Sequence, residues 1–251
     1  MPKYIKLTET KSTNSYLMQV ASNLPGGTVI YTFRQTGGRG QKGNSWESEF
    51  DKNLSFSYLL KKPAVQAKHQ FYISEAVSLA VLDFLSQYTT GIKIKWPNDI
   101  YYNDFKICGM LIENSLDGKE IAHSIPGIGI NINQETFLSD APNPISLKNI
   151  TGKDYDLEAL LRDVCARIEQ LCLFEGATRD DFKKLHERYL AHLYRNDGKP
   201  HTWQLPDGTQ FQGTIVDVEP DGMLALRHNH DNSIHRYAFK EVKHVIGNVS
   251  L

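Results

Sequence analysis

The segment Gln35-Thr-Gly-Gly-Arg-Gly-Gln-Lys-Gly-Asn-Ser-Trp46 stands directly after an apolar, β-branched run, Thr28-Val-Ile-Tyr-Thr-Phe33. A short run of this kind, bounded by glycine and charge, predicts a strand. The four glycines of the segment let backbone N–H groups approach an anion closely, and Arg39 and Lys42 add positive charge that suits a phosphate or carboxylate. We therefore expect an anion-binding loop here in preference to a flexible hairpin tip.

The glycines also spell G-x-G-x-x-G over Gly38, Gly40 and Gly43, the pattern of dinucleotide-binding loops. That pattern needs a helix whose N-terminus holds a pyrophosphate. Residues 44–52 carry no apolar helical period, so the helix is not expected. No Gly-Lys-Ser/Thr closes the loop either, which excludes a Walker-type phosphate loop.

A second polar segment, Lys95-Trp-Pro-Asn-Asp99, is followed by Lys106 and then by a buried-strand pattern over 107–112. A proline restricts the residue before it to extended backbone, so the segment should form a rigid corner. A lysine at the mouth of a buried strand needs an anionic partner. Alone, the region would be an ordinary β-hairpin, but together with the glycine-rich loop it predicts an active-site wall.

Two further segments are less specific on their own. Ser12-Thr-Asn14 precedes a short helical pattern over 15–21, where a helix N-cap is the simpler interpretation. Gly127-Ile-Gly-Ile-Asn131 is an apolar strand pattern broken by glycines. Missing side chains there would make room for a flat ligand or a close backbone.

The chain is expected to fold as α+β with a smaller all-β unit at its end. Helical periodicity appears over 77–88 and 157–168, and Thr178 to Asp181 predicts a capping box that opens a third helix through Leu193. After residue 198 the pattern changes to short strands over 211–218 and 223–226 with a tight turn between them. We therefore place domain boundaries at 1–195 and 196–251, the second a small β-barrel.

Composition excludes several classes of protein. The 251 residues hold 28 Lys+Arg against 29 Asp+Glu, a formal charge of −1, which argues against a broad polycationic surface for nucleic acid. No apolar run approaches the roughly 18 residues needed to span a bilayer, and the N-terminus has no signal-peptide pattern. We expect a cytoplasmic protein without a membrane partner.

Cysteines and histidines predict neither disulfides nor a metal site. The three cysteines form no C-x-x-C pair, and no H-E-x-x-H occurs among the nine histidines. Three histidines cluster in a polar stretch that resembles a solvated strand edge more than a ligand set; they are His228, His230 and His235. We therefore expect no bound metal among the side chains and small, buried cysteines.

Taken in order, the polar segments resemble the biotin protein ligases, also called biotin–acetyl-CoA-carboxylase ligases. The order is Ser-Thr-Asn, Gln-x-x-Gly-Arg-Gly-x-x-Gly-x-x-Trp, Lys-Trp-Pro-Asn-Asp, Lys-x-x-Gly-x-x-x-Glu and Gly-x-Gly-x-Asn, from Ser12 to Asn131. The resemblance implies a mixed sheet flanked by helices, with an SH3-like barrel at the C-terminus. It also implies two half-reactions: biotin and Mg–ATP give biotinyl-5′-AMP, and a lysine of a biotin carboxyl carrier protein then accepts the biotinyl group.

The resemblance also implies site residues. The biotin-binding set carried over is Ser12, Thr13, Asn14, Gln35, Gly38, Arg39, Gly40, Gln41, Lys106 and Gly109. The set expected to bind ATP and the adenylate is Arg39, Lys42, Trp46, Lys95, Asn98 and Asn131, with Trp46 as an aromatic lid over the adenine. Lys106, Arg39 and Asp99 are the expected catalytic residues, Asp99 as the group that orients the acceptor amine or relays its proton. Mg²⁺ is expected to accompany ATP.

The chain departs from the family pattern in its loop. Many members carry arginine where this chain has Gln41, and often where it has Asn44, so the loop is less cationic here. Members that double as repressors carry an N-terminal winged helix, for which residues before Ser12 leave no room, so we expect no DNA binding. A lipoate-protein ligase and a non-catalytic binder of biotin or its adenylate are the alternative functions.

The resemblance leaves two matters open. The oligomeric state is monomer or homodimer. The barrel either packs near the nucleotide or docks the carrier protein.

Overall fold

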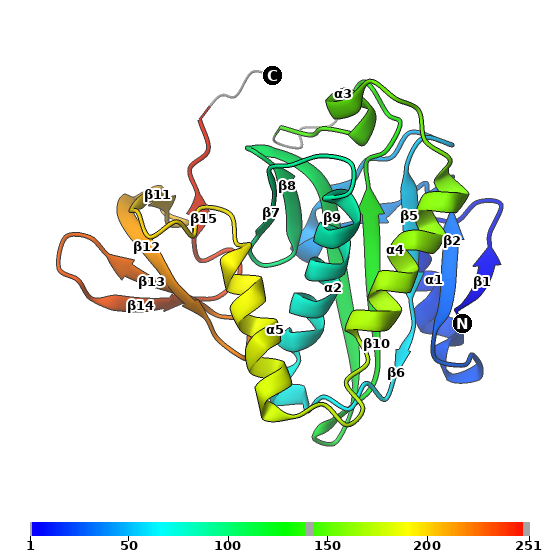
Figure 1. The fold of residues 1–251 in the computed structure, drawn as a ribbon, viewed down its shortest axis with the longest axis horizontal. Coiled ribbons are helices and arrows are strands. Elements are labelled where there is room, and N and C mark those ends of the chain that lie inside the picture. The colour runs from blue at the N-terminus through cyan, green and yellow to red at the C-terminus, as the bar shows by residue number, and fades with distance from the viewer. Residues whose placement is uncertain (1, 139–142, 248–251) are drawn as a thin grey trace.

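The computed structural model describes residues 2–138 and 143–247, and Figure 1 shows a large sheet with helices on its faces and a smaller sheet beside it. The strands of the large sheet follow the order β1-β2-β5-β10-β9-β8-β7, with β6 paired to β10. Their bounds are β1 Lys3–Lys6, β2 Thr28–Thr32, β5 Leu54–Tyr58, β6 Leu60–Lys61, β7 Ile92–Lys95, β8 Asp99–Tyr102, β9 Phe105–Asp117 and β10 Glu120–Ile130.

The large sheet is mixed. β1 and β2 run parallel, whereas the other neighbouring strands pair antiparallel. The long β9–β10 hairpin forms its centre, with Gly127 opposite Leu111 and Gly129 opposite Gly109. These facing glycines leave a bare patch on the sheet, which becomes the floor of the site described below.

Helices cover both faces of this sheet. Their bounds are α1 Thr13–Val20, α2 Phe71–Leu85, α3 Leu147–Thr151, α4 Leu157–Leu171 and α5 Arg179–Ala191. Alternate residues of β2 point to opposite faces, as the period of two in a strand requires. Ile30 packs with Leu17 of α1, while Val29 packs in the main core with α2 and α4. The main core therefore lies on the α2–α4 face, and α1 covers the other.

The second sheet is antiparallel and comes from the end of the chain. Its strands are β11 His201–Gln204, β12 Gln210–Val218, β13 Leu224–His228, β14 Ile234–Tyr237 and β15 Lys243–His244. They follow the open order β14-β13-β12-β11-β15, and Trp203 of β11 and Leu226 of β13 are buried. The α+β class with a mixed, helix-flanked sheet is thus confirmed. The C-terminal part is an antiparallel sheet consistent with an SH3-like domain, although the described strands do not trace a closed barrel.

The two sheets meet beside the Lys95–Asp99 corner. The indole Nε1 of Trp96 donates to Gly222 O at 2.9 Å, and the ring centroids of Trp96 and Phe239 lie 6.3 Å apart. His186 of α5 joins Glu75 of α2 to Asp217 of β12, at 2.7 and 2.9 Å. The C-terminal sheet is therefore bonded to the large-sheet unit at more than one point.

Most sequence-based element predictions are confirmed, with shifts at their ends. The pattern over 107–112 extends to the whole of β9, because the strand is half-exposed beyond Met110 and loses its apolar signature there. The run 54–60 is split into β5 and β6. All three cysteines are buried and free. Every helix in the described part of the chain is too short or too polar to span a bilayer.

Candidate active site

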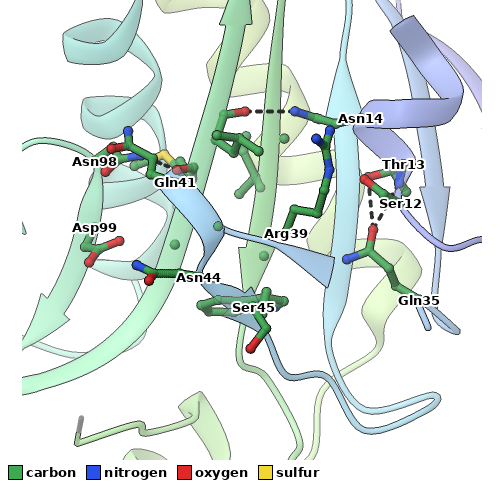
Figure 2. Close-up of a pocket in the computed structure, with 18 of the residues that line it drawn as sticks. Ser12, Thr13, Asn14, Gln35, Arg39, Gln41, Asn44, Ser45, Asn98 and Asp99 are labelled. Carbon is green, nitrogen blue, oxygen red and sulfur yellow. Dashed lines mark hydrogen bonds between the residues drawn. The ribbon is translucent and has the colours of Figure 1, made fainter. Parts of the chain in front are cut away.

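One pocket on the bare patch of the sheet collects residues from segments that are far apart in the sequence (Figure 2). Its lining residues are Ser12, Thr13, Asn14, Gln35, Arg39, Gly40, Gln41, Asn44, Ser45, Trp46, Asn98, Asp99, Lys106, Gly109, Met110, Leu111, Gly127, Ile128, Gly129 and Phe239. Figure 2 shows Asn98, Asp99 and Gln41 on one side and Ser12, Thr13 and Gln35 on the other.

The first wall is the N-terminus of α1. Ser12 caps the helix by accepting from Ser15 N at 3.4 Å, so the N-cap interpretation is confirmed. Thr13 N and Thr13 Oγ1 both donate to Gln35 Oε1, at 3.0 and 3.4 Å. This contact joins the start of the helix to the start of the glycine-rich loop, so the cap residues also line the pocket.

Asn14 is fixed by bonds on both ends of its amide. Its Oδ1 accepts from Ser57 Oγ at 2.5 Å, and its Nδ2 donates to Leu111 O and Glu113 Oε2 at 3.0 and 2.9 Å. A Cβ on Gly127 would lie only 2.1 Å from Asn14 Oδ1. The glycine is thus required for Asn14 to reach the sheet, and Asn14 is 3% exposed.

The glycine-rich loop folds as a small hairpin, with β3 Gly38–Arg39 paired to β4 Ser45–Trp46. Arg39 Nη2 contacts both carboxylate oxygens of Glu113 on β9, at 3.1 and 3.3 Å. In the described chain the loop leads into β4 and then β5, so the helix that a dinucleotide-binding loop requires does not directly follow it. Lys42 lies at the tip of this loop, with its side chain outside the described part of the structure.

Trp46 lies directly on the glycine floor. A Cβ at Gly129 would be 2.4 Å from Trp46 Cε2, and one at Gly109 would be 2.9 Å from Trp46 Cζ3. The indole Nε1 is buried without a hydrogen-bond partner among the described residues. The facing glycines therefore admit a flat ring, but the ring is the side chain of Trp46, whereas the sequence pattern predicted room for a flat ligand or a close backbone.

Lys106 and Asp99 form the charged end of the pocket. Lys106 Nζ lies 2.8 Å from Asp99 Oδ1, with their side chains 23% and 22% exposed, so the expected anionic partner exists. The same ammonium lies 5.6 Å from the centre of the Trp46 ring. Asn98 is pinned by a bond from its Nδ2 to Met110 O and is 6% exposed. The turn between β7 and β8 contains the cis Trp96–Pro97 bond, and it presents Asn98 and Asp99 toward β9.

Among the predicted residues that the structure describes in full, three do not line this pocket. Gly38 is a close-approach position, since a Cβ there would lie 2.5 Å from Trp46 O. Asn131 is 2% exposed and donates to Ile145 O at 3.1 Å. Lys95 lies in a neighbouring cavity with Trp203 and His244. Their assignments stay predictions.

Lys95 is the cation of that second cavity. Burial lowers its pKa, an effect that Asp99 partly opposes. Its ammonium lies 5.0 Å from the centre of the Tyr101 ring. Asn44 and Phe239 line both cavities, so the two spaces adjoin. An anion that extended beyond the first pocket would approach Lys95 there.

Sequence reasoning missed part of the lining. The unassigned residues are Asn44, Ser45, Met110, Leu111, Gly127, Ile128, Gly129 and Phe239. The two glycines belong to a segment whose missing side chains were noted but not assigned to a ligand. Phe239 comes from the C-terminal sheet region, and no local pattern marks it, because only the packing of that region against Trp96 brings it to the pocket.

Comparison with known proteins places this geometry in a family. The biotin/lipoate A/B protein ligase family model matches residues 4–131, just over half of the chain. That range contains every lining residue of the pocket except Phe239.

Individual relatives extend the match beyond that range. The bifunctional ligase/repressor BirA of Bacillus subtilis is 28% identical over 237 residues, which cover 89% of this chain and 68% of that protein. The biotin–[acetyl-CoA-carboxylase] ligase of Mycobacterium tuberculosis is 28% identical over 88% of this chain and 81% of its own. The structure of the biotin protein ligase from Aquifex aeolicus in complex with biotin and ATP superposes with a TM-score of 0.78, at 26% identity, over 98% of this chain and 100% of that chain.

Proposed function

Because this chain belongs to the biotin/lipoate A/B protein ligase family, and its relatives include biotin protein ligases in both sequence and structure, we propose that it is an ATP-dependent biotin protein ligase. It forms biotinyl-5′-AMP from biotin and ATP. It then transfers the biotinyl group to a specific lysine of the biotin carboxyl carrier protein of acetyl-CoA carboxylase.

The observation that carries the proposal is the convergence of the predicted segments on one pocket. Residues from the N-terminus of α1, the glycine-rich loop, the 95–99 corner, β9 and β10 meet around it. Such a pocket offers an amide-lined end, a flat floor of glycines covered by the Trp46 ring, and a cationic end. This arrangement suits a ligand with a polar ring system and a carboxylate.

The first half-reaction brings two anions together. A carboxylate oxygen of biotin attacks the α-phosphorus of ATP, the bond to the β-phosphate oxygen breaks, and pyrophosphate leaves. Fixed positive charge is the main requirement, because it offsets repulsion and stabilises the pentavalent transition state. Lys106 is the cation held at the pocket's charged end, and Arg39 supplies further N–H donors from the loop.

Biotin is held by the amide-rich end in this proposal. Ser12, Thr13, Asn14 and Gln35 offer hydroxyl and amide groups toward its ring, and Gly40, Gln41 and Gly109 border its path toward Lys106. Gln41 lines the pocket, so a neutral amide and not a cation borders the adenylate in this proposal.

The nucleotide occupies the side near the 95–99 corner. Asn98 borders the pocket there, Trp46 offers an aromatic face, and Lys95 lies in the adjoining cavity where a polyphosphate would extend. We keep Lys42 and Asn131 as proposed nucleotide-side residues from the family pattern alone.

Magnesium would enter with ATP, since no cluster of three or more potential ligands exists among the described residues. Asp99 is the carboxylate that lines the pocket, which suits an ion bound mostly by phosphates and water.

The second half-reaction makes an amide. The acceptor lysine attacks the acyl carbon, the bond to the phosphate oxygen breaks, AMP leaves, and the amine loses a proton. A free lysine has a pKa of about 10.4, so it is largely protonated at neutral pH. Asp99 lies at the charged end, where it can accept a hydrogen bond from that amine and orient it.

We further propose domain boundaries at 1–195 and 196–251. All five strands of the second sheet lie between residues 201 and 244. The contacts of Trp96 with Gly222 and Phe239 support a role for the second domain near the nucleotide side of the pocket. This favours packing at the pocket over carrier docking as its main role.

The test is pyrophosphate release from ATP by the purified chain with Mg²⁺, with and without biotin. The proposal predicts biotin-dependent release, followed by mass gain of one biotinyl group on a carrier-protein acceptor. Lipoate in place of biotin serves as the control, because the family also includes lipoate ligases. Release driven by lipoate and not by biotin, or no release from folded protein, would overturn it.

A further inference from the structure

The glycine-rich loop touches the sheet through the side chains of Arg39 and Trp46. Trp46 makes an apolar contact with Gly109 and Gly129. Arg39 makes an ion pair with Glu113, whose Oε2 lies 3.1 Å from Nη2. Glu113 is not itself a lining residue of the pocket, yet it contacts two residues that are.

The carboxylate of Glu113 forms hydrogen bonds with both walls of the pocket, the N-terminus of α1 and the glycine-rich loop. Its Oε2 accepts from Asn14 Nδ2 at 2.9 Å and from Arg39 Nη2 at 3.1 Å. Asn14 cannot rotate away freely, because Ser57 donates to its Oδ1 and Leu111 accepts from its Nδ2. The carboxylate is therefore oriented from the α1 side before it meets the loop.

The ion pair between Arg39 and Glu113 is weak enough to break and re-form as the loop moves. The side chains of Arg39 and Glu113 are 48% and 31% exposed, and solvent-exposed ion pairs are weak. Glu113 engages only Nη2 of a side chain that carries five N–H donors. Arg39 can thus stay bonded to Glu113 while other donors face the pocket, and the loop can still open.

We propose that Glu113 is a positioning residue. Through its contact with Arg39, it holds the glycine-rich loop on the sheet beside the fixed side chain of Asn14. This inference rests in part on the proposed function, because a docked loop shields the biotinyl-adenylate from water until the acceptor lysine arrives. Glu113 acts through Arg39 and does not contact the reacting atoms.

The first experiment needs no ligand and is independent of the proposed function. Trypsin cleaves after Lys42, at the loop tip, and cleavage in native protein tracks the open population when closing is fast. Glu113→Gln keeps the size of the side chain and the bond to Asn14 but removes the charge. We expect cleavage after Lys42 to become about fivefold faster. The matched control is Glu120→Gln, at the start of β10 and outside the pocket lining, which should leave the rate unchanged.

A double variant tests whether Glu113 acts through Arg39. Arg39→Gln alone should also speed cleavage after Lys42, and adding Glu113→Gln should then have little further effect. Equal cleavage rates in wild type, Glu113→Gln and Glu120→Gln would overturn the inference. So would a Glu113→Gln effect that persists in full in the Arg39→Gln background. If Glu113→Gln does not fold, Arg39→Gln, which alters an exposed side chain, supplies the same comparison.

The second experiment follows the intermediate. With biotin, Mg–ATP and an acceptor, Glu113→Gln should release about five times more excess pyrophosphate over biotin transferred than wild type, because adenylate escapes from an open loop. If Glu113→Gln speeds cleavage after Lys42 but leaves the ratio of pyrophosphate released to biotin transferred unchanged, the docked loop does not shield the adenylate. Absence of biotin-dependent pyrophosphate release in wild type would instead overturn the proposed function and leave the cleavage result standing.

Discussion

Lys106 is the residue on which the proposed chemistry depends most. It is the pocket cation whose position is fixed by a 2.8 Å ion pair, and its side chain is only 23% exposed. A positioned cation is worth most where charge develops in a site of low solvent access. We therefore expect Lys106→Ala to lower kcat by about a hundredfold or more and to raise KM for biotin.

Steady-state pyrophosphate release checks this expectation, with Lys119→Ala on the exposed β9–β10 turn as the control. If Lys106 served only to bind biotin, Lys106→Ala would lose biotin affinity but keep its rate at saturating biotin. An unchanged kcat in Lys106→Ala would therefore contradict the catalytic role.

Gly129 is the second residue with a sharp expectation. A methyl group there would lie 2.4 Å from the Trp46 ring, so the indole must leave the floor of the pocket. The ring is the end of a side chain, and the fold itself can persist. Gly129→Ala should weaken biotin binding about tenfold, or about 1.4 kcal/mol, while Tm falls by only a few degrees.

Isothermal titration with biotin and a thermal scan measure both quantities for Gly129→Ala. Gly247→Ala is the matched control, since a Cβ at Gly247 meets nothing within 4 Å. Unaltered biotin affinity in Gly129→Ala would show that the close fit of Trp46 on the floor is not needed for binding.

At the level of elements, the start of α5 shows a signal that sequence alone could locate. Thr178 Oγ1 accepts from Asp181 N at 3.3 Å, and Thr178 N donates to Asp181 Oδ2 at 2.9 Å, which completes the predicted capping box. Thr178→Ala should reduce the free energy of unfolding by about 1 kcal/mol. Urea titration tests this, with Thr178→Ser as the variant that keeps the hydroxyl. A loss of equal size in both variants would mean that the hydroxyl does not cap the helix.

Elements were predictable where local rules govern them. Caps, amphipathic periods and glycine-bounded apolar runs located α4, α5, β2 and β12 closely. The far half of β9 was not predictable, because it is held by pairing with β10 and not by its own apolar pattern. Pairing between strands that are distant in sequence depends on tertiary context, which local sequence patterns do not reveal.

At the scale of the whole molecule, His186 couples three elements. Its Nδ1 faces Glu75 of α2, which is 1% exposed, and its Nε2 faces Asp217 of the C-terminal sheet. Only an imidazolium can donate to both carboxylates. The bond to Glu75 raises the pKa of His186 to about 9, despite burial, which opposes the shift.

The pH dependence follows from that direction. The pKa of His186 is higher in the folded protein than the ordinary value of about 6.5, so its stabilisation is complete below that pH and is lost as pH rises through about 9. His186→Gln should therefore cost about 2 kcal/mol of unfolding free energy at pH 6, and much less at pH 10. Denaturant titrations of both proteins at each pH give the difference. A cost that does not change between pH 6 and 10 would contradict the charged clamp.

The site was predictable to the extent that its residues lie in contiguous polar segments. Arg39, Asp99 and Lys106 were located by charge and glycine content, and the pocket contains all three. Phe239 and Glu113 were not assigned, because their roles arise from contacts across the sheet or between domains. The family pattern predicts Lys95 on the nucleotide side. Its burial beside the second sheet was not predictable, because it depends on Trp203 and His244, which are distant in the sequence.

A crystal structure of this chain with biotin and ATP would locate the reacting groups relative to Lys106. We expect biotin's ring system at the end formed by Thr13, Asn14 and Gln35. We expect its activated carboxyl carbon beside the α-phosphate, with Lys106 Nζ at hydrogen-bond distance from the acyl or phosphate oxygen. A map that places the biotin carboxyl outside this pocket, or out of reach of Lys106, would contradict this placement.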